Sequence, residues 1–213
     1  QLQLMNSRIS PLWTAEGQSP FLLGTDEQGR DVFSAILYGL RISLAVGVAG
    51  VIFAGALGIA LGLVAGYFGG AVDGVIMRIA DVQLTFPAIL IALLVNGIAK
   101  SILGNRLDAT SMLVVLVISI GLSFWVGYAR TVRGSVMVEK NKDYVAAAQL
   151  IGLPAPKIMF RHVLPNTMGP ILVIATINLA LAIITEATLS FLGVGLPDTM
   201  PSLGTLIRIG NNY

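Results

Sequence analysis

The chain has 213 residues, of which 55% are hydrophobic and 11% are charged, and its formal net charge is +2. Soluble domains carry about 25% charged residues, so this composition excludes an ordinary soluble domain and indicates a membrane protein. The small charge excess gives no basic surface for nucleic acid, and a chain with no cysteine and one histidine offers no disulfide framework, redox thiol or metal site.

The first 41 residues precede the first long apolar run. They include GTDEQGRD (24–31), a glycine-rich acidic stretch that, taken alone, also fits an ordinary turn. Asp31 is placed to cap a helix that starts at the next residue. Residues 1–41 are therefore predicted to be a segment outside the membrane that ends in an amphipathic helix in the bilayer interface. The apolar face of that helix consists of Val32, Phe33, Ile36, Leu37 and Leu40.

Four long uncharged stretches follow. A spanning helix needs about 20 mostly apolar residues, and helices buried in soluble proteins seldom run this long without a charge. We therefore predict an all-α fold, a polytopic transmembrane helix bundle that occupies residues 42–213. The four predicted spans are 42–68, 82–99 with a start near residue 75, 111–129 and 163–185.

The first span carries small residues at every fourth position. Such a stripe lets another helix approach closely, so it predicts a packing seam. The alternative is that glycine and alanine are simply frequent in membrane helices. The stripe consists of Gly50, Ala54, Gly58, Gly62 and Gly66.

Cations are concentrated in the stretch 130–162, whereas the loop 100–110 holds only Lys100 and Arg106. Because cytoplasmic loops are enriched in lysine and arginine, the stretch 130–162 is predicted to be cytoplasmic. The segment before residue 42 and the tail after residue 185 are then outside. The cations of the stretch are Arg130, Arg133, Lys140, Lys142, Lys157 and Arg161.

Within this stretch, VAAAQLIGLPAPKIMFRHVLPN (145–166) contains three prolines and many apolar residues. We expect a short helix over residues 144–151, with Gly152 in the left-handed conformation after it and Pro154 preventing its continuation. A second short helix is expected to begin near Pro156. Because a solvated loop does not need so many apolar side chains, the pattern indicates a surface that docks a soluble partner.

Five motifs of the chain resemble motifs of one protein family. AAAQLIG followed by RHVLPN resembles the cytoplasmic loop of ABC importer permeases, in which an EAA-type triplet, a glycine and a later Leu-Pro mark the surface that docks on the ATPase. GTDEQGRD, AGYFGGAVD, GYARTVRG and SFLGVG resemble the peptide and nickel branch of that family. The triplet has Ala146 where glutamate is usual, and Leu203 stands where tryptophan is common. The matching loop positions are Ala146, Ala147, Ala148, Gly152, Leu164 and Pro165.

The resemblance implies a type I ABC importer permease with six spans in the complete protein, in the bacterial inner (plasma) membrane. Its partners would be a second, homologous permease subunit in a heterodimer, two ATPase subunits that use ATP and magnesium, and an extracytoplasmic solute-binding protein. The chain itself would bind no cofactor and have no catalytic residue, and its coupling loop would cover residues 130–162. The expected ATPase-coupling residues are Tyr144, Ala146, Ala147, Ala148, Gly152, Leu153, Ile158, Phe160, Leu164 and Pro165.

The implied solute is a dipeptide or oligopeptide, with a nickel chelate or another small polar solute as the alternative. A channel or pore-forming subunit is the competing class of protein, because glycine-rich helices also pack in channels. Polar residues of the last two spans are candidates for the substrate path, although each is equally consistent with a side chain satisfied by a neighbouring helix. These candidates are Ser123, Asn178, Thr185 and Glu186.

Overall fold

The computed structural model describes residues 4–104, 108–197 and 200–211, and within them it contains helices and no β-strand. The prediction of an all-α helix bundle is therefore confirmed. The elements are η1 (Leu4–Asn6), α1 (Val32–Phe68), α2 (Gly70–Leu84), α3 (Ala88–Leu103), α4 (Ala109–Glu139), α5 (Asp143–Leu150), α6 (Ala155–Ile158), η3 (Met159–Val163), η4 (Leu164–Thr167), α7 (Met168–Phe191) and α8 (Leu203–Gly210).

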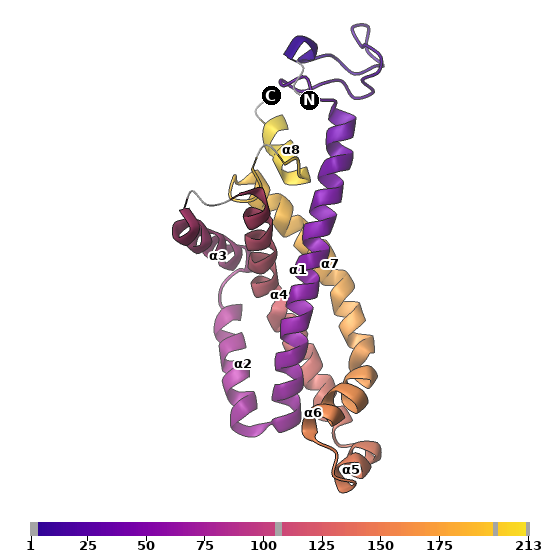
Figure 1. Ribbon diagram of the computed structural model, residues 1–213, viewed down its shortest axis with the longest axis vertical. Helices are drawn as coiled ribbons and strands as arrows, with labels where there is room; N and C mark the ends of the chain where they lie inside the picture. Colours follow the sequence, from indigo (N-terminus) through magenta and orange to yellow (C-terminus); the bar gives the residue numbers. More distant parts are fainter. Residues whose placement is uncertain (1–3, 105–107, 198–199, 212–213) are drawn as a thin grey trace.

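The bundle is elongated (Figure 1). Helices α5 and α6 lie at one end, here called the loop end, and α8 lies with the N-terminal segment at the opposite end, here called the far end. Helix α1 runs between the two ends beside α4 and α7. The two ends therefore present different segments of the chain to the two sides of a membrane.

Three helical stretches of the described chain are long and apolar enough to cross a membrane, namely Val32–Phe68, Ala109–Glu139 and Ala155–Phe191. Helices α2 and α3 together would provide a fourth crossing, but their axes meet at 95°. The predicted four spans are thus obtained only when this bent pair is counted as one.

The bend is located at Thr85-Phe86-Pro87, inside the stretch that the sequence predicts as a single helix. Pro87 has no backbone N–H, and its ring disfavours helical geometry at the preceding residue. Helix α2 accordingly ends at Leu84, and Pro87 takes extended geometry as the N-cap of α3. The structure therefore replaces the predicted straight span by two half-helices.

Helix α1 begins where the sequence predicts, because the Asp31 side chain accepts a hydrogen bond from the Ser34 backbone N–H at 3.0 Å. No break follows at residue 42, so the expected interfacial helix is instead the first part of a continuous helix of 37 residues. Such a helix is about 55 Å long, whereas the hydrocarbon core of a bilayer is about 30 Å thick. Helix α1 is therefore longer than one perpendicular crossing requires, and near Gly39 it contacts α8.

Helices α1 and α4 form the most extensive helix pair of the bundle. All five small residues of the predicted stripe are buried, and a methyl group on any of its four glycines would meet atoms of α4. A methyl group on Gly62 would lie 2.6 Å from the Ala129 carbonyl oxygen, and one on Gly66 would lie 2.8 Å from Val136 Cβ. The backbones of the two helices are thus close enough that no side chain fits between them at these positions.

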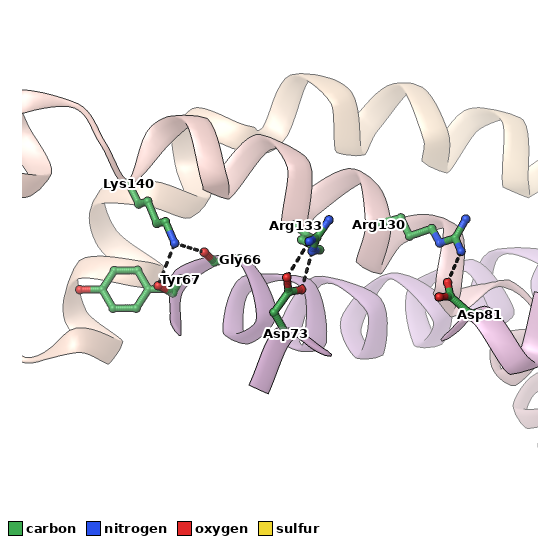
Figure 2. Close-up of polar contacts among 7 residues, drawn as sticks. All are labelled: Gly66, Tyr67, Asp73, Asp81, Arg130, Arg133 and Lys140. Carbon is green, nitrogen blue, oxygen red and sulfur yellow. Dashed lines mark hydrogen bonds and ion pairs between the residues drawn. The ribbon is translucent and has the colours of Figure 1, made fainter. Parts of the chain in front are cut away.

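Ion pairs join α2 to α4 toward the loop end (Figure 2). The Arg133 guanidinium forms two hydrogen bonds to the Asp73 carboxylate, one of them from Nη2 to Oδ2 at 2.6 Å. Arg130 pairs with Asp81 on the same two helices. Bidentate arginine–carboxylate pairs fix relative orientation as well as distance, so these contacts set how α2 lies against α4.

Lys140, directly after α4, contacts the last turn of α1. Its Nζ donates to the carbonyl oxygens of Gly66 at 2.7 Å and Tyr67 at 3.3 Å (Figure 2). Carbonyl groups at a helix C-terminus have no partner within the helix and carry partial negative charge, which a cation stabilises. The loop end is therefore held together by polar contacts as well as by packing.

Candidate functional site

The loop end has the helix–turn–helix form that its sequence predicts. Helix α5 ends at Leu150, Gly152 has φ +77°, and α6 begins directly after Pro154, which is its N-cap. Pro156 lies in the first turn of α6, where a missing N–H costs nothing. The prediction of two short helices around a left-handed glycine is confirmed.

A π-helical turn, η3, connects α6 to η4 and α7. In it the Leu164 backbone N–H bonds to the Met159 carbonyl oxygen, five residues earlier. The next residue, Pro165, has no N–H to offer, so the regular α-helical ladder is interrupted here. The chain nevertheless continues as one helical stretch, Ala155–Phe191, which connects the loop directly to the membrane bundle.

One side of the loop is anchored in the bundle core. Ile158 is 1% exposed, and it belongs to a buried apolar cluster that also contains Leu63 of α1 and Tyr128 of α4. Any contribution of Ile158 to docking is therefore indirect, through the position it gives to the loop. The loop residues buried in this cluster are Val145, Ala148, Ile158, Met159 and Val163.

A polar network holds the start of α5. The Glu139 carboxylate accepts hydrogen bonds from Lys142 Nζ at 2.7 Å and from the Tyr144 hydroxyl at 2.8 Å. Asn166 Nδ2 in turn donates to the Tyr144 oxygen at 3.2 Å and to the His162 carbonyl at 2.7 Å. The network therefore links the end of α4, the start of α5 and η4.

Two groups of this network that lie outside the membrane-spanning helices, Lys142 and Tyr144, have raised pKa values. The hydrogen bond to Glu139 raises the pKa of Lys142, and burial, followed by the hydrogen bond to Glu139, raises the pKa of Tyr144. The contribution of the Lys142 contact is fully present below the usual lysine pKa and is lost only when the pH rises above the raised value. The network therefore stays intact at neutral pH.

The other side of the loop is apolar and exposed. Leu150, Ile151 and Phe160 are 88%, 75% and 57% exposed, and Ala146 and Ala147 are exposed beside them. These five residues are here called the docking face. Among the other predicted coupling residues, Gly152 and Pro165 are exposed, Tyr144, Leu153 and Leu164 are half-buried, and Ala148 and Ile158 are buried.

Leu150 and Ile151 are not among the matched positions of the family motif, but they belong to the apolar pattern of residues 144–160 that predicts docking, and they are the most exposed large apolar side chains of the loop. The signal for them is present in the sequence, since two large apolar residues stand directly before a helix-ending glycine. The docking face therefore includes positions that motif matching alone does not identify.

The four path candidates do not form one site. Ser123 and Thr185 each bond to a carbonyl of their own helix, Ser119 O at 2.7 Å and Leu181 O at 2.8 Å, as hydroxyls in membrane helices commonly do. Within the described residues no hydrogen bond joins any two of the four, and no group of three or more histidine or acidic side chains is placed to hold a metal.

Asn178 and Glu186 are both buried in α7. In the described part of the chain, Asn178 Nδ2 makes no hydrogen bond of acceptable geometry. Glu186, expected at the outer end of its span, instead lies five residues before the end of α7, and the hydroxyls of Ser43 and Ser190 donate to it. Its burial reflects a continuation of α7 to Phe191 and contacts with α1 that residue spacing does not reveal.

The sequence model of the family described as "binding-protein-dependent transport system inner membrane component" matches residues 58–211. The chain is 38% identical over 205 residues to the dipeptide transport system permease protein of Haemophilus influenzae. The aligned residues make up 96% of the chain and 66% of that relative. It is 39% identical over 203 residues to a di/tripeptide transport system permease protein of Pseudomonas aeruginosa, covering 95% of the chain and 64% of the relative.

The oligopeptide transport system permease protein of Bacillus subtilis is 37% identical over 187 residues, covering 88% of the chain and 58% of the relative. The chain thus spans between 58% and 66% of the length of these three curated relatives. The family match covers most of the chain and includes the docking face, the small residues of α1 from Gly58 onward, and α7. The chain therefore belongs to the family of inner membrane components of binding-protein-dependent transport systems.

Proposed function

We propose that this chain is the transmembrane permease subunit of an ATP-driven ABC importer that moves dipeptides or oligopeptides across the bacterial inner membrane. The observation that carries the proposal is the docking face, a group of exposed apolar side chains on a loop whose other side is anchored in the bundle. The names of the three relatives, which refer to dipeptide, di/tripeptide and oligopeptide transport, support a peptide as the solute.

In this function the chain performs no covalent chemistry. Two separate ATPase subunits bind ATP and magnesium and move together, and each pulls on the docking face of one permease subunit. A second, homologous permease completes a heterodimer around the path, and an extracytoplasmic binding protein delivers the solute to the far end. The work of ATP hydrolysis biases the bundle between two packings, which gives alternating access.

The structure supports this transmission in two ways. The buried residues Ile158, Met159 and Val163 pack the loop against the membrane helices, so a movement of the docking face is transmitted to those helices. The Glu139 network ties the same loop to the end of α4, which the pairs of Arg130 and Arg133 join to α2. Force at the loop end would therefore reach α2, α4 and α7 together.

The proposed orientation places residues 1–41 outside and the coupling loop, residues 130–162, in the cytoplasm. Because the chain has no cysteine, single introduced cysteines report their side without background. We expect an impermeant maleimide to label Lys142→Cys and Lys157→Cys only from the cytoplasmic side, and Gln28→Cys only from the outside. Asn105 belongs to the loop 100–110, which the cation bias predicts to be on the outside; it lies outside the described residues, and we expect it to label with Gln28. Labelling of Lys157→Cys from the outside would contradict the orientation and the docking assignment with it.

Introducing a charged side chain into the docking face tests whether this surface binds the ATPase subunits. We expect Ile151→Asp to weaken association with the ATPase subunits and to lower ATP-dependent peptide uptake by about tenfold or more, since a buried unpaired carboxylate at an apolar interface costs several kcal/mol. Co-purification of the ATPases and uptake of labelled dipeptide into vesicles measure the two effects.

The matched control is Leu12→Asp, the same kind of change at an exposed leucine of the N-terminal segment. It should leave association with the ATPases intact. Equal uptake by Ile151→Asp and Leu12→Asp would show that the loop is not the coupling surface. Peptide flux that continues without ATP would instead favour a channel.

A further inference from the structure

The far end of the bundle contains a buried carboxyl group with no cationic partner among the described residues. Glu186 is 0% exposed, and its two oxygens accept hydrogen bonds from Ser43 Oγ at 2.6 Å and Ser190 Oγ at 2.7 Å. Burying a carboxyl group is costly unless it is fully hydrogen-bonded. Both oxygens are used here, one by α7 itself and one by α1, so the carboxyl group fastens two helices together.

Ser43 extends this contact to a third helix. Its hydroxyl oxygen accepts a hydrogen bond from the Leu203 backbone N–H at 3.2 Å while its hydrogen is donated to Glu186. Leu203 is the first residue of α8, where backbone N–H groups have no acceptor within the helix. The bonds therefore run from α8 through α1 to α7.

Close backbone packing surrounds these bonds. A methyl group on Gly39 of α1 would lie 3.1 Å from the Ser202 carbonyl carbon, and one on Gly204 would collide with the Ala187 carbonyl group of α7. Helix α8 thus packs so closely against α1 and α7 that no side chain fits between the backbones at Gly39 and Gly204.

Helix α8 also forms one wall of a cavity of about 720 Å³ at the far end. The opposite walls come from the first turns of α1 and from the N-terminal segment. The side chains of α8 that line the cavity are Leu203, Leu206, Ile207 and Ile209, and those of α1 are Val32, Ala35 and Ile36. The position of α8 therefore determines whether this cavity, here called the outer cavity, is formed.

We propose that Glu186 is a positioning residue that, through Ser43, latches α8 onto α1 and α7 and so keeps the outer cavity formed. Glu186 lies in the same continuous helical stretch, Ala155–Phe191, that begins beside the docking face. A displacement of the loop is transmitted along this helical stretch to Glu186. The docking face and the α8 wall of the outer cavity are therefore coupled through one helix. This coupling rests on the proposed transport function, whereas the latch itself does not.

Two substitutions open the latch in different ways. Ser43→Ala removes both the donor to Glu186 and the acceptor for Leu203. Glu186→Gln keeps the size of the side chain but replaces one acceptor oxygen by an amide that donates, so one of the two serine hydroxyls loses its acceptor. The matched control is Ser119→Ala, which removes another buried serine hydroxyl that donates to a carbonyl of its own helix, Val115 O at 2.7 Å.

The position of α8 is measured directly with spin labels at Ile207→Cys on α8 and Leu37→Cys on α1, both exposed, in an otherwise cysteine-free chain reconstituted in nanodiscs. We expect a narrow distance distribution in the parent and in Ser119→Ala. In Ser43→Ala and Glu186→Gln the population with a displaced α8 should rise about tenfold or more, as expected when a buried polar group loses its hydrogen-bond partner. The double variant should resemble Ser43→Ala alone, because both changes break the same connection.

Unchanged α8 distances in both Ser43→Ala and Glu186→Gln would overturn the latch, whatever happens to uptake. Peptide uptake in the complete transporter, measured at equal membrane levels, tests the coupling: it should fall severalfold in both variants and stay normal in Ser119→Ala. A displaced α8 with normal uptake would overturn the coupling. Absence of peptide uptake in the parent would contradict the proposed solute, while the distance measurement would still decide the latch.

Discussion

Replacing Gly62 with leucine is expected to prevent α1 and α4 from assembling into the bundle. A β-carbon at this position meets the Ala129 carbonyl oxygen at 2.6 Å and Val132 Cβ at 2.8 Å, and the first of these is backbone that cannot turn away. Overpacking of this kind costs about 1–3 kcal/mol even in deformable cores. Membrane helices associate mainly through close packing, so the loss falls on the principal contact of the fold.

The measurement is the thermal stability of the detergent-solubilised protein, followed by fluorescence-detected size exclusion, together with its level in the membrane. Gly134→Leu is the control, because Gly134 lies in α4 with no atom within 4 Å of an added β-carbon. We expect Gly62→Leu to be found as aggregate or at low level, and Gly134→Leu to behave as the parent. Equal stability of the two variants would show that the α1–α4 seam does not hold the bundle.

Replacing Gly152 with valine should abolish coupled uptake while leaving the bundle folded. Gly152 has φ +77°, and no atom lies within 4 Å of an added β-carbon, so the effect arises from the backbone alone. A left-handed conformation costs an ordinary residue about 1–2 kcal/mol, and a β-branched residue tolerates it worst. The chain would relieve this strain by redirecting the turn before Pro154, which moves Leu150 and Ile151 out of the docking face.

Association with the ATPase subunits and peptide uptake, compared at equal membrane levels, measure this effect. Gly152→Asn is the control, since asparagine adopts positive φ more readily than other residues with a side chain, and Gly152→Ala should lie between the two. Melting temperatures should be alike in all three, because Ile158 and Met159 anchor the loop independently of the turn. Normal uptake by Gly152→Val would show that coupling does not depend on the shape of this turn.

The sequence predicts those parts of the fold that depend on local rules. Asp31 begins a helix, Gly152 reverses the chain with positive φ, and long uncharged stretches form the membrane helices. Each of these follows from a capping group, a missing side chain or hydrophobic length, which a short window of residues contains.

The features that escaped prediction depend on residues far apart in the chain. Ser43 and Glu186 are separated by 143 positions, so spacing gave no reason to pair them, and the inward turn of Ile158 follows from a cluster with α1 and α4. The bend at Pro87 has both a local and a distant cause. Proline supplies a local reason to end the helix, but some membrane helices continue through a proline when neighbouring helices satisfy the freed backbone groups. Here α2 ends, and Gln83 bonds to the Leu122 carbonyl oxygen of α4 at 2.6 Å.

The ion pairs between α2 and α4 have a consequence for the biogenesis of the protein. A chain emerges from the ribosome N-terminus first, so Asp73 and Asp81 of α2 are made 60 and 49 residues before Arg133 and Arg130, the partners that neutralise them. Until then the hairpin of α1 and α2 carries two unpaired carboxylates. Insertion of α4 in the wrong direction would leave these carboxylates and both arginines without partners on opposite sides of the membrane. The pairs would thus provide a late check on topology, in which the orientation of α4 has to agree with that of α1 and α2.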